Sequence, residues 1–137
     1  MITLPRAMQA DGFQILYRAI RDGSRADRYS FWAVDRDYAE QYGGEVIEGQ
    51  IQPEANILDI TEMIDGGGYI HGETLDAAVP GLADALGIDV ETEIECDRLW
   101  DAAGDDLTSA ADLLDDAGFD GFRWVEDCRR EAYLLIH

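Results

Sequence analysis

The residues best suited to chemistry lie near the two ends of this 137-residue chain. Arg18 stands in an apolar segment near the beginning, and two carboxylates, Glu131 and its alternative Asp127, stand close to the end. A guanidinium group binds phosphate oxygens through its planar fork of N–H donors. A carboxylate stabilises positive charge that develops in a transition state. These residue types would suit a phosphorylated substrate whose reacting atom becomes cationic.

Aromatic residues form a second set of candidates. Phe31 and Trp32 follow Ser30 directly, and Tyr42 comes a short distance later. Their rings would offer flat faces on which a planar heterocycle can stack. The alternative for Phe31 and Trp32 is burial in the core, where large aromatic side chains are usually found.

The charged candidates also have structural alternatives. Arg18 could be a surface arginine on a half-buried strand. Glu131 lies in a strongly charged stretch and could be a solvated turn residue. Glu126 competes with Asp127 as a further carboxylate of the same predicted hairpin.

Strands must position these residues. Segments rich in apolar and aromatic residues, bounded by Asp-Gly pairs and other turn signals, predict strands over residues 13–20, 29–34, 45–52, 56–60, 119–126 and 131–136. The last two are expected to form a hairpin. A short helix that Asp35 caps is expected after the second strand, and it ends at Gly43 and Gly44.

The middle of the chain has a different composition. From about Thr61 to Gly118 helix-forming residues predominate, and glycines and Pro80 interrupt them. Helical segments are expected over residues 73–86, 89–103 and 108–118. The glycine triplet 66–68 is expected to be a flexible hinge, because it lacks the lysine and the spacing of a phosphate-binding loop. The sequence therefore predicts a single α+β domain over residues 1–137, with a helical insertion at about 61–118.

The charge balance excludes several classes of function. The chain holds 30 Asp and Glu against 10 basic residues, all of them arginine, for a net charge of -20. It lacks the positive surface that neutralises phosphates, so we expect no direct nucleic-acid binding. No apolar run reaches bilayer-spanning length and no signal sequence is visible, so we expect a cytoplasmic protein without membrane contact. Both cysteines and both histidines lack metal-ligand spacing, so no metal site is expected.

Three segments, taken in order, resemble the ADP-ribosyltransferase superfamily of the arginine-serine-glutamate type. Leu16-Tyr17-Arg18-Ala19 resembles its first-strand motif. YSFWAVDRDYAEQYGG (29–44) is similar to its second motif, in which a strand leads into a helix carrying an alanine and then an aromatic residue, here Ala39 and Tyr42. GFDGFRWVEDCRREAYLLI (118–136) is similar to the closing hairpin of small members. The resemblance covers roughly residues 13–60 and 118–137.

The resemblance implies an ADP-ribosyltransferase-like fold, a split and mainly antiparallel β core, and an activity that uses NAD as substrate. Cleavage of the nicotinamide–ribose bond passes through an oxocarbenium-like state, which a carboxylate near the ribose stabilises. The implied catalytic residues are Glu131, Asp127 and Arg18. The implied NAD-binding residues are Arg18, Ser30, Phe31, Trp32 and Tyr42.

The sequence departs from the family pattern at two places, and one of them bears on which residue accepts the ADP-ribose. Phe31-Trp32-Ala33 stands where the family has Ser-Thr-Ser, with only Ser30 adjacent. Arg129 stands two positions before Glu131, where members that modify arginine carry a second acidic residue. The acceptor of the ADP-ribose therefore need not be arginine.

The resemblance also points to a kind of partner. Small acidic members with helical insertions include phage-encoded inhibitors of bacterial defence, among them anti-CRISPR transferases that modify a DNA-recognition subunit. A phage effector of this kind would act in the host cytoplasm on a protein with a basic surface, within a nucleic-acid-binding complex. The alternative is a non-catalytic acidic inhibitor that mimics DNA and occupies such a surface. A third possibility is a degenerate member of the fold retained as an interaction module.

Overall fold

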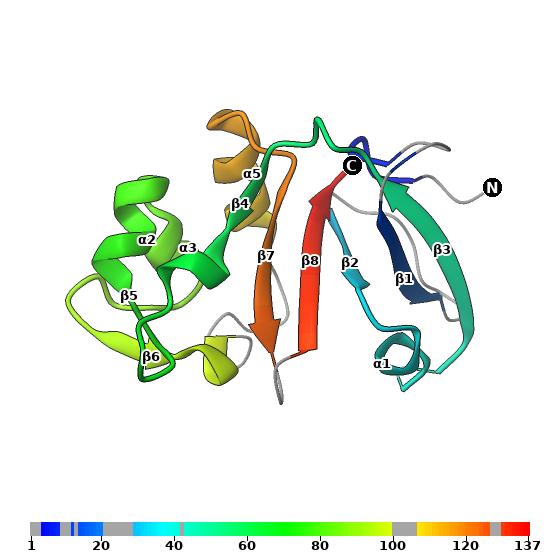
Figure 1. The fold of residues 1–137 in the computed structure, drawn as a ribbon. Helices are drawn as coiled ribbons and strands as arrows, with labels where there is room; N and C mark the ends of the chain where they lie inside the picture. The colour runs from blue at the N-terminus through cyan, green and yellow to red at the C-terminus, as the bar shows by residue number, and fades with distance from the viewer. Residues whose placement is uncertain are drawn as a thin grey trace.

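The chain folds into an α+β structure built on a six-stranded, mainly antiparallel sheet (Figure 1). The computed structural model describes residues 4–8, 12, 14–20, 29–41, 43–99, 107–126 and 130–137. The strands are β1 (Gln14–Ile20), β2 (Tyr29–Ala33), β3 (Glu45–Ile51), β4 (Ile57–Asp59), β5 (Tyr69–His71), β6 (Glu93–Glu95), β7 (Gly121–Glu126) and β8 (Arg130–Ile136). The main sheet has the order β3-β1-β2-β8-β7-β4, and β5 and β6 form a second sheet.

The helices are short. They are α1 (Arg36–Glu40), α2 (Gly72–Ala78), α3 (Leu82–Ala85) and α5 (Thr108–Asp116), with 3₁₀ turns η1 (Ile60–Met63) and η2 (Cys96–Arg98). Every helix within the described ranges is too short or too polar to cross a lipid bilayer. The break at Pro80 is confirmed, since α2 ends before it and α3 begins after it. Gly118 closes α5 as expected, with a φ of 89° that favours glycine.

All six strands expected outside the middle of the chain are confirmed, close to their expected bounds. The hairpin of β7 and β8 is paired from Gly121↔Leu135 to Glu126↔Arg130. The short β4 runs parallel to β7, which brings Asp59 opposite Arg123. The chain therefore joins its middle to its closing hairpin through a pairing between residues far apart in sequence.

The insertion, expected to be helical, also contains the two-stranded sheet of β5 and β6. Residues 89–99 do not form the predicted helix: they make a turn, then β6 and η2, while residues 100–103 lie outside the described ranges. Asp89 closes the turn, because its carboxylate accepts from the N–H of Glu91 at 3.0 Å and its carbonyl from that of Thr92 at 3.1 Å. Ile94 then pairs with Ile70 on β5. Local turn chemistry and cross-strand pairing therefore override the helical periodicity.

The glycine triplet expected as a hinge forms a hydrogen-bonded turn. The Asp65 carboxylate accepts from the N–H of Gly67 at 2.9 Å and from that of Tyr69 at 3.0 Å. Gly68, with a φ of 85°, donates to the Asp65 carbonyl at 3.1 Å. This turn leads directly from η1 into β5.

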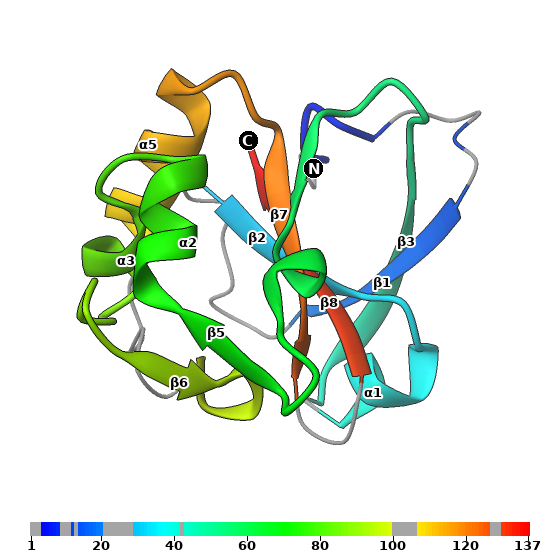
Figure 2. The same cartoon turned by 60° about the vertical axis from the view of Figure 1, so that its left-hand side comes forward.

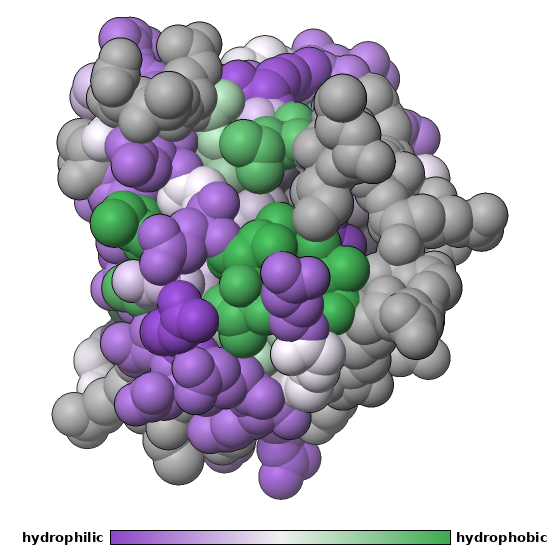
Figure 3. All heavy atoms as spheres, turned by 90° about the vertical axis from the view of Figure 1, so that its right-hand side faces the viewer, coloured by the Kyte–Doolittle hydropathy of each residue, from purple (hydrophilic) through white to green (hydrophobic). Residues whose placement is uncertain are grey.

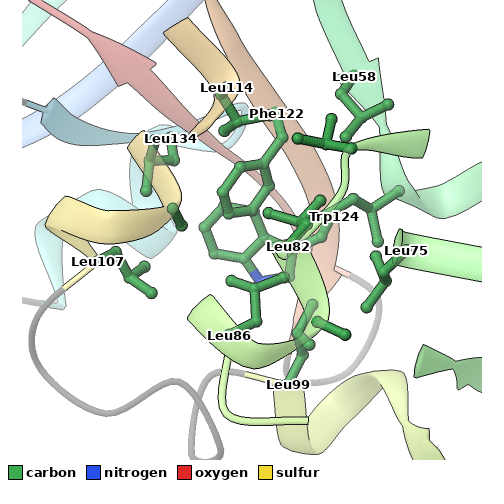
Figure 4. Close-up of a cluster of buried hydrophobic side chains, with 14 of the residues drawn as sticks. Leu58, Leu75, Leu82, Leu86, Leu99, Leu107, Leu114, Phe122, Trp124 and Leu134 are labelled. Atoms are coloured by element: carbon green, nitrogen blue, oxygen red, sulfur yellow. The ribbon is translucent and has the colours of Figure 1, made fainter. Parts of the chain in front are cut away.

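The insertion covers one face of the main sheet, here called the insertion face. Leucines of the insertion surround Phe122 and Trp124 of β7 (Figure 4). The labelled leucines of this cluster from the insertion are Leu75, Leu82, Leu86, Leu99, Leu107 and Leu114. Phe122 alternates with Arg123 along β7, so the strand buries its aromatic rings here and turns Arg123 to the other face.

The opposite face, here called the N-terminal face, is partly covered by Ala7 and Met8. They pack on Leu16, Trp32 and Leu135. The backbone of this segment bridges two strands, since Arg6 donates to the carbonyl of Ile136 at 3.3 Å and Met8 pairs with Ile51. The N-terminal segment therefore connects the end of β3 to the end of β8 through backbone hydrogen bonds.

The main sheet divides between β1 and β2. Within the described residues these strands share one paired position, Tyr17↔Ala33, whereas β1 and β3 are paired along their full length. Figure 2 shows β1 and β3 steeply inclined to β2 and β8. The sheet thus consists of a two-stranded part and a four-stranded part that meet at a narrow junction.

The side of the molecule that carries β3 has a hydrophobic area with hydrophilic residues to its left and below it in the view of Figure 3. Ile15, on the neighbouring strand β1, is 42% exposed. The surface on this side is therefore locally apolar despite the acidic composition of the chain.

Candidate functional site

Arg18 lies on the N-terminal face at the junction between β1 and β2. It stands opposite Ile47 on β3, one residue after the single position that pairs β1 with β2. The side chain is partly buried, and this burial lowers the pKa of Arg18 from its ordinary value. The guanidinium therefore loses some of its hydration when the protein folds.

Arg18 differs from the other arginines with described side chains because no carboxylate of the described residues lies within ion-pair distance of it. The others lie within 4.0 Å of carboxylates, and they are Arg6, Arg36, Arg98 and Arg123. Arg18 makes no ion pair and no side-chain hydrogen bond within the described part of the chain. In a protein with a net charge of -20, a desolvated and unpaired arginine is a ready partner for an anion.

Ser30 and Trp32 lie on the same face and contact each other. The Trp32 indole N–H donates to the Ser30 hydroxyl at 2.8 Å, and both side chains are buried. Nε2 of His137 lies 2.7 Å from the same hydroxyl oxygen. Burial and the nearby charge of Arg18 lower the pKa of His137. The Ser30 hydroxyl is therefore engaged by two neighbours, and Arg18 has a histidine close by.

Glu131 lies at the start of β8, also on the N-terminal face. Nη2 of Arg123 donates to Oε1 of Glu131 at 3.2 Å. Nε of the same arginine lies 3.4 Å from Oδ1 of Asp59. Arg123 therefore bridges the candidate carboxylate and a second carboxylate from β4.

A cross-strand row connects the two candidate charges. Trp32 lies opposite Tyr133, Tyr133 opposite Arg123, and Arg123 opposite Asp59. Directly opposed residues of neighbouring strands share a face. The row therefore crosses the N-terminal face from β2, the strand next to Arg18, to Asp59. Burial raises the pKa of Tyr133, as do the negative charges of Glu131 and Asp59, while Arg123 opposes this shift. Two aromatic rings therefore separate Arg18 from the carboxylate bridge.

Arg18 and Glu131 share the face but do not touch. One strand, β2, lies between β1 and β8, so their backbones are at least two interstrand spacings apart, about 10 Å or more. The charge of Arg18 acts on His137, whereas the Glu131 carboxylate is held by Arg123. Between the two groups lie Trp32 and Tyr133, which are buried in one cluster with Ala7 and Met8.

Phe31 is not brought together with these residues. It lies on the insertion face, where its ring packs edge-on against Tyr29, with centroids 5.5 Å apart, and against Trp124, at 6.0 Å. Asp127 and Tyr42 lie outside the described residues. Of the sites predicted from sequence, the structure thus groups Arg18, Ser30, Trp32 and Glu131.

Four residues near the site were missed by sequence reasoning, namely Asp59, Arg123, Tyr133 and His137. Arg123 gave a signal: like Arg18, it is an arginine in an otherwise apolar strand. The contribution of Asp59 depends on the parallel pairing of β4 with β7, which has no local signature. Within the described ranges, no His, Cys, Asp and Glu side chains cluster so as to hold a metal ion.

Comparison of the chain with models of protein families, with curated proteins and with solved structures finds no match in any of the three. What the site can do chemically therefore follows from its own geometry. That geometry is an unpaired arginine, a bridged carboxylate and two aromatic rings between them on one face.

Proposed function

We propose that the protein is a mono-ADP-ribosyltransferase that moves ADP-ribose from NAD to a protein target. The observation that carries this proposal is the shared face of Arg18 and Glu131, on strands separated only by β2. NAD presents a pyrophosphate and a ribose whose anomeric carbon becomes cationic during cleavage. An unpaired arginine and a carboxylate on one face match these two requirements.

Arg18 anchors the pyrophosphate in this proposal. NAD carries negative phosphates, and the overall field of a chain with a net charge of -20 opposes their approach. The Arg18 guanidinium, which forms no ion pair with a carboxylate of the described residues, offers the local positive charge that compensates. His137 beside it adds no competing negative side chain.

Glu131 stabilises the transition state. The C1′–N bond of NAD breaks, its electron pair leaves with nicotinamide, and the ribose becomes oxocarbenium-like. A nucleophilic atom of the target then forms a bond to C1′ and loses a proton to solvent or to a base. The carboxylate acts mainly on the transient positive charge, so its effect is larger in the transition state than in the bound substrate.

The target is proposed to be a protein with a basic surface in the cytoplasm. Exposed carboxylates on the insertion support this view, and they include Glu73, Asp84, Glu91, Asp112 and Asp116. They lie on the elements that cover the insertion face, whereas Arg18 and Glu131 lie on the other face. Opposite charge would accelerate association with such a target, and salt would slow it.

The test is incubation of the purified protein with NAD labelled in the adenylate part, together with basic proteins of a bacterial lysate. Transfer of label to one of them, with release of nicotinamide, is the expected result. The second candidate function is a non-catalytic inhibitor that mimics DNA, which the net charge of -20 favours. Tight binding to a DNA-binding protein without consumption of NAD would support that candidate and contradict the first.

A further inference from the structure

Arg123 makes a two-carboxylate bridge in a partly buried position. Its side chain is 28% exposed, that of Glu131 is 38% exposed and that of Asp59 is 26% exposed. Nη2 donates to Glu131 at 3.2 Å, and Nε lies 3.4 Å from Asp59. The Nη2 contact is a hydrogen bond, whereas the contact of Nε with Asp59 is an ion pair, since Nε has no hydrogen-bond partner among the described residues. A planar guanidinium can face two carboxylates in this way, which the single ammonium group of a lysine cannot do.

The bridge is anchored at its far end. The Asp59 carboxylate accepts a hydrogen bond from the N–H of Thr61 at 3.0 Å and another from the Thr61 hydroxyl. Thr61 belongs to η1, the first element of the insertion. Asp59 therefore has a defined position, and through Arg123 it gives the Glu131 carboxylate a defined position as well.

The combined charge of Asp59, Arg123 and Glu131 leaves Glu131 able to stabilise a positive charge. Two carboxylates and one guanidinium sum to one net negative charge. Asp59 thus offsets the positive charge of Arg123, which would otherwise neutralise Glu131. Among the described contacts, Oε2 of Glu131 makes no hydrogen bond, so one oxygen remains available to a ligand.

We propose that Arg123 is a positioning residue for the transfer reaction, and that Asp59 holds it in place and balances its charge. This inference rests on the proposed function. Carboxylates stabilise a transition state best when they are oriented before the reaction begins. Displacement of a catalytic group by about 1 Å can cost about 10²-fold in rate.

The experiment measures NAD cleavage by the full chain with Arg123→Gln, Arg123→Lys and Asp59→Asn. The matched control is Arg36→Gln, because Arg36 also lies between two carboxylates, Glu40 at 3.1 Å and Glu48 at 3.3 Å, away from the site. We expect Arg123→Gln to lower kcat about 10- to 100-fold and to change KM for NAD by less than about three-fold. The stability of each variant is measured as the midpoint of its unfolding in urea. Relative to Arg123→Gln, Arg123→Lys should recover more of the wild-type midpoint than of the wild-type kcat. Asp59→Asn should lower kcat, because Arg123 would then neutralise Glu131.

The outcomes separate this inference from the proposed function. A wild-type protein that cleaves no NAD would overturn the function, and the positioning role with it. An active wild type with Arg123→Gln folded and kcat unchanged would overturn the positioning role alone. An increase in KM with kcat unchanged would also overturn it, because Arg123 would then bind NAD directly. If Arg123→Gln fails to fold, Arg123→Lys and Asp59→Asn test the inference instead. A kcat equal to that of the wild type in both variants would reject it.

Discussion

Trp32 and Tyr133 lie directly opposite each other on β2 and β8, and both are buried on the N-terminal face. On this face they lie between Arg18 and Arg123, the residue that bridges Asp59 and Glu131. Tyr133 is close enough to Arg123 for the guanidinium to oppose the rise in the pKa of Tyr133. The buried pair therefore lies between the two charged groups to which the proposed function assigns NAD.

The first prediction concerns the catalytic carboxylate. Glu131→Gln should lower the rate of NAD cleavage about 10²–10³-fold, the scale of losing one preorganised electrostatic contact. NAD affinity should fall much less, because the contact strengthens mainly in the transition state. Rates and calorimetric binding, measured with Glu40→Gln as a surface control, check this. Full activity in both Glu131→Gln and Asp127→Asn would show that neither carboxylate is catalytic.

The second prediction concerns the anion anchor. Arg18→Gln should weaken NAD binding by about 10- to 100-fold, because a charge-assisted hydrogen bond contributes about 1.5–3 kcal/mol. The effect should appear in KM more than in kcat. Arg98→Gln is the matched control, since Arg98 is an exposed arginine paired with Glu95 at 3.6 Å. Equal affinity in Arg18→Gln and the control would remove Arg18 from the binding site.

The third prediction concerns His137. Its pKa is lowered by burial and by Arg18, so the folded protein takes up this proton at a lower pH than the unfolded chain. The stability that the neutral imidazole contributes is therefore present above pH 6.5 and is lost as the pH falls through the folded pKa. NMR titration of the ring should show the low pKa, and Arg18→Gln should raise it. An unchanged titration in Arg18→Gln would contradict the proximity of the two groups.

The fourth prediction concerns target recognition. Reversing the exposed charges of Glu73, Asp84 and Asp116 should weaken association with a basic protein and reduce its dependence on salt. NAD hydrolysis without target should change little, since these residues lie away from the N-terminal face. Surface-plasmon resonance and hydrolysis assays on the same variant compare the two. A parallel loss of both activities would argue against separate surfaces for target and NAD.

Sequence reasoning succeeded where one local signal decided the outcome. Alternating apolar segments gave the strands, and Arg18 stood out as a charge within one of them. The same alternation implies that Phe31 and Trp32 point to opposite faces, but it does not say which face the insertion covers. The packing of Phe31 on Trp124 depends on that choice, so its place on the insertion face could not be predicted.

The missed part of the site depends on contacts between distant segments. Asp59 and Arg123 are 64 positions apart in the numbering, and the parallel pairing of β4 with β7 joins them. In the insertion, the helical period predicted for residues 89–99 competed with a turn at Asp89 and with the pairing of Ile94 to Ile70. Tertiary pairing decided both cases, and a single sequence contains little trace of it.

The narrow junction between β1 and β2 has a mechanical consequence. Among the described residues, five paired positions join β2 to β8 and seven join β1 to β3, against one between β1 and β2. Bending at this junction can therefore change the angle between the two parts while each hydrogen-bonded ladder stays intact. Arg18 belongs to one part and Glu131 to the other. The distance between Arg18 and Glu131 thus depends on the angle between the two parts of the sheet. It can change without a change in the rotamer of either side chain.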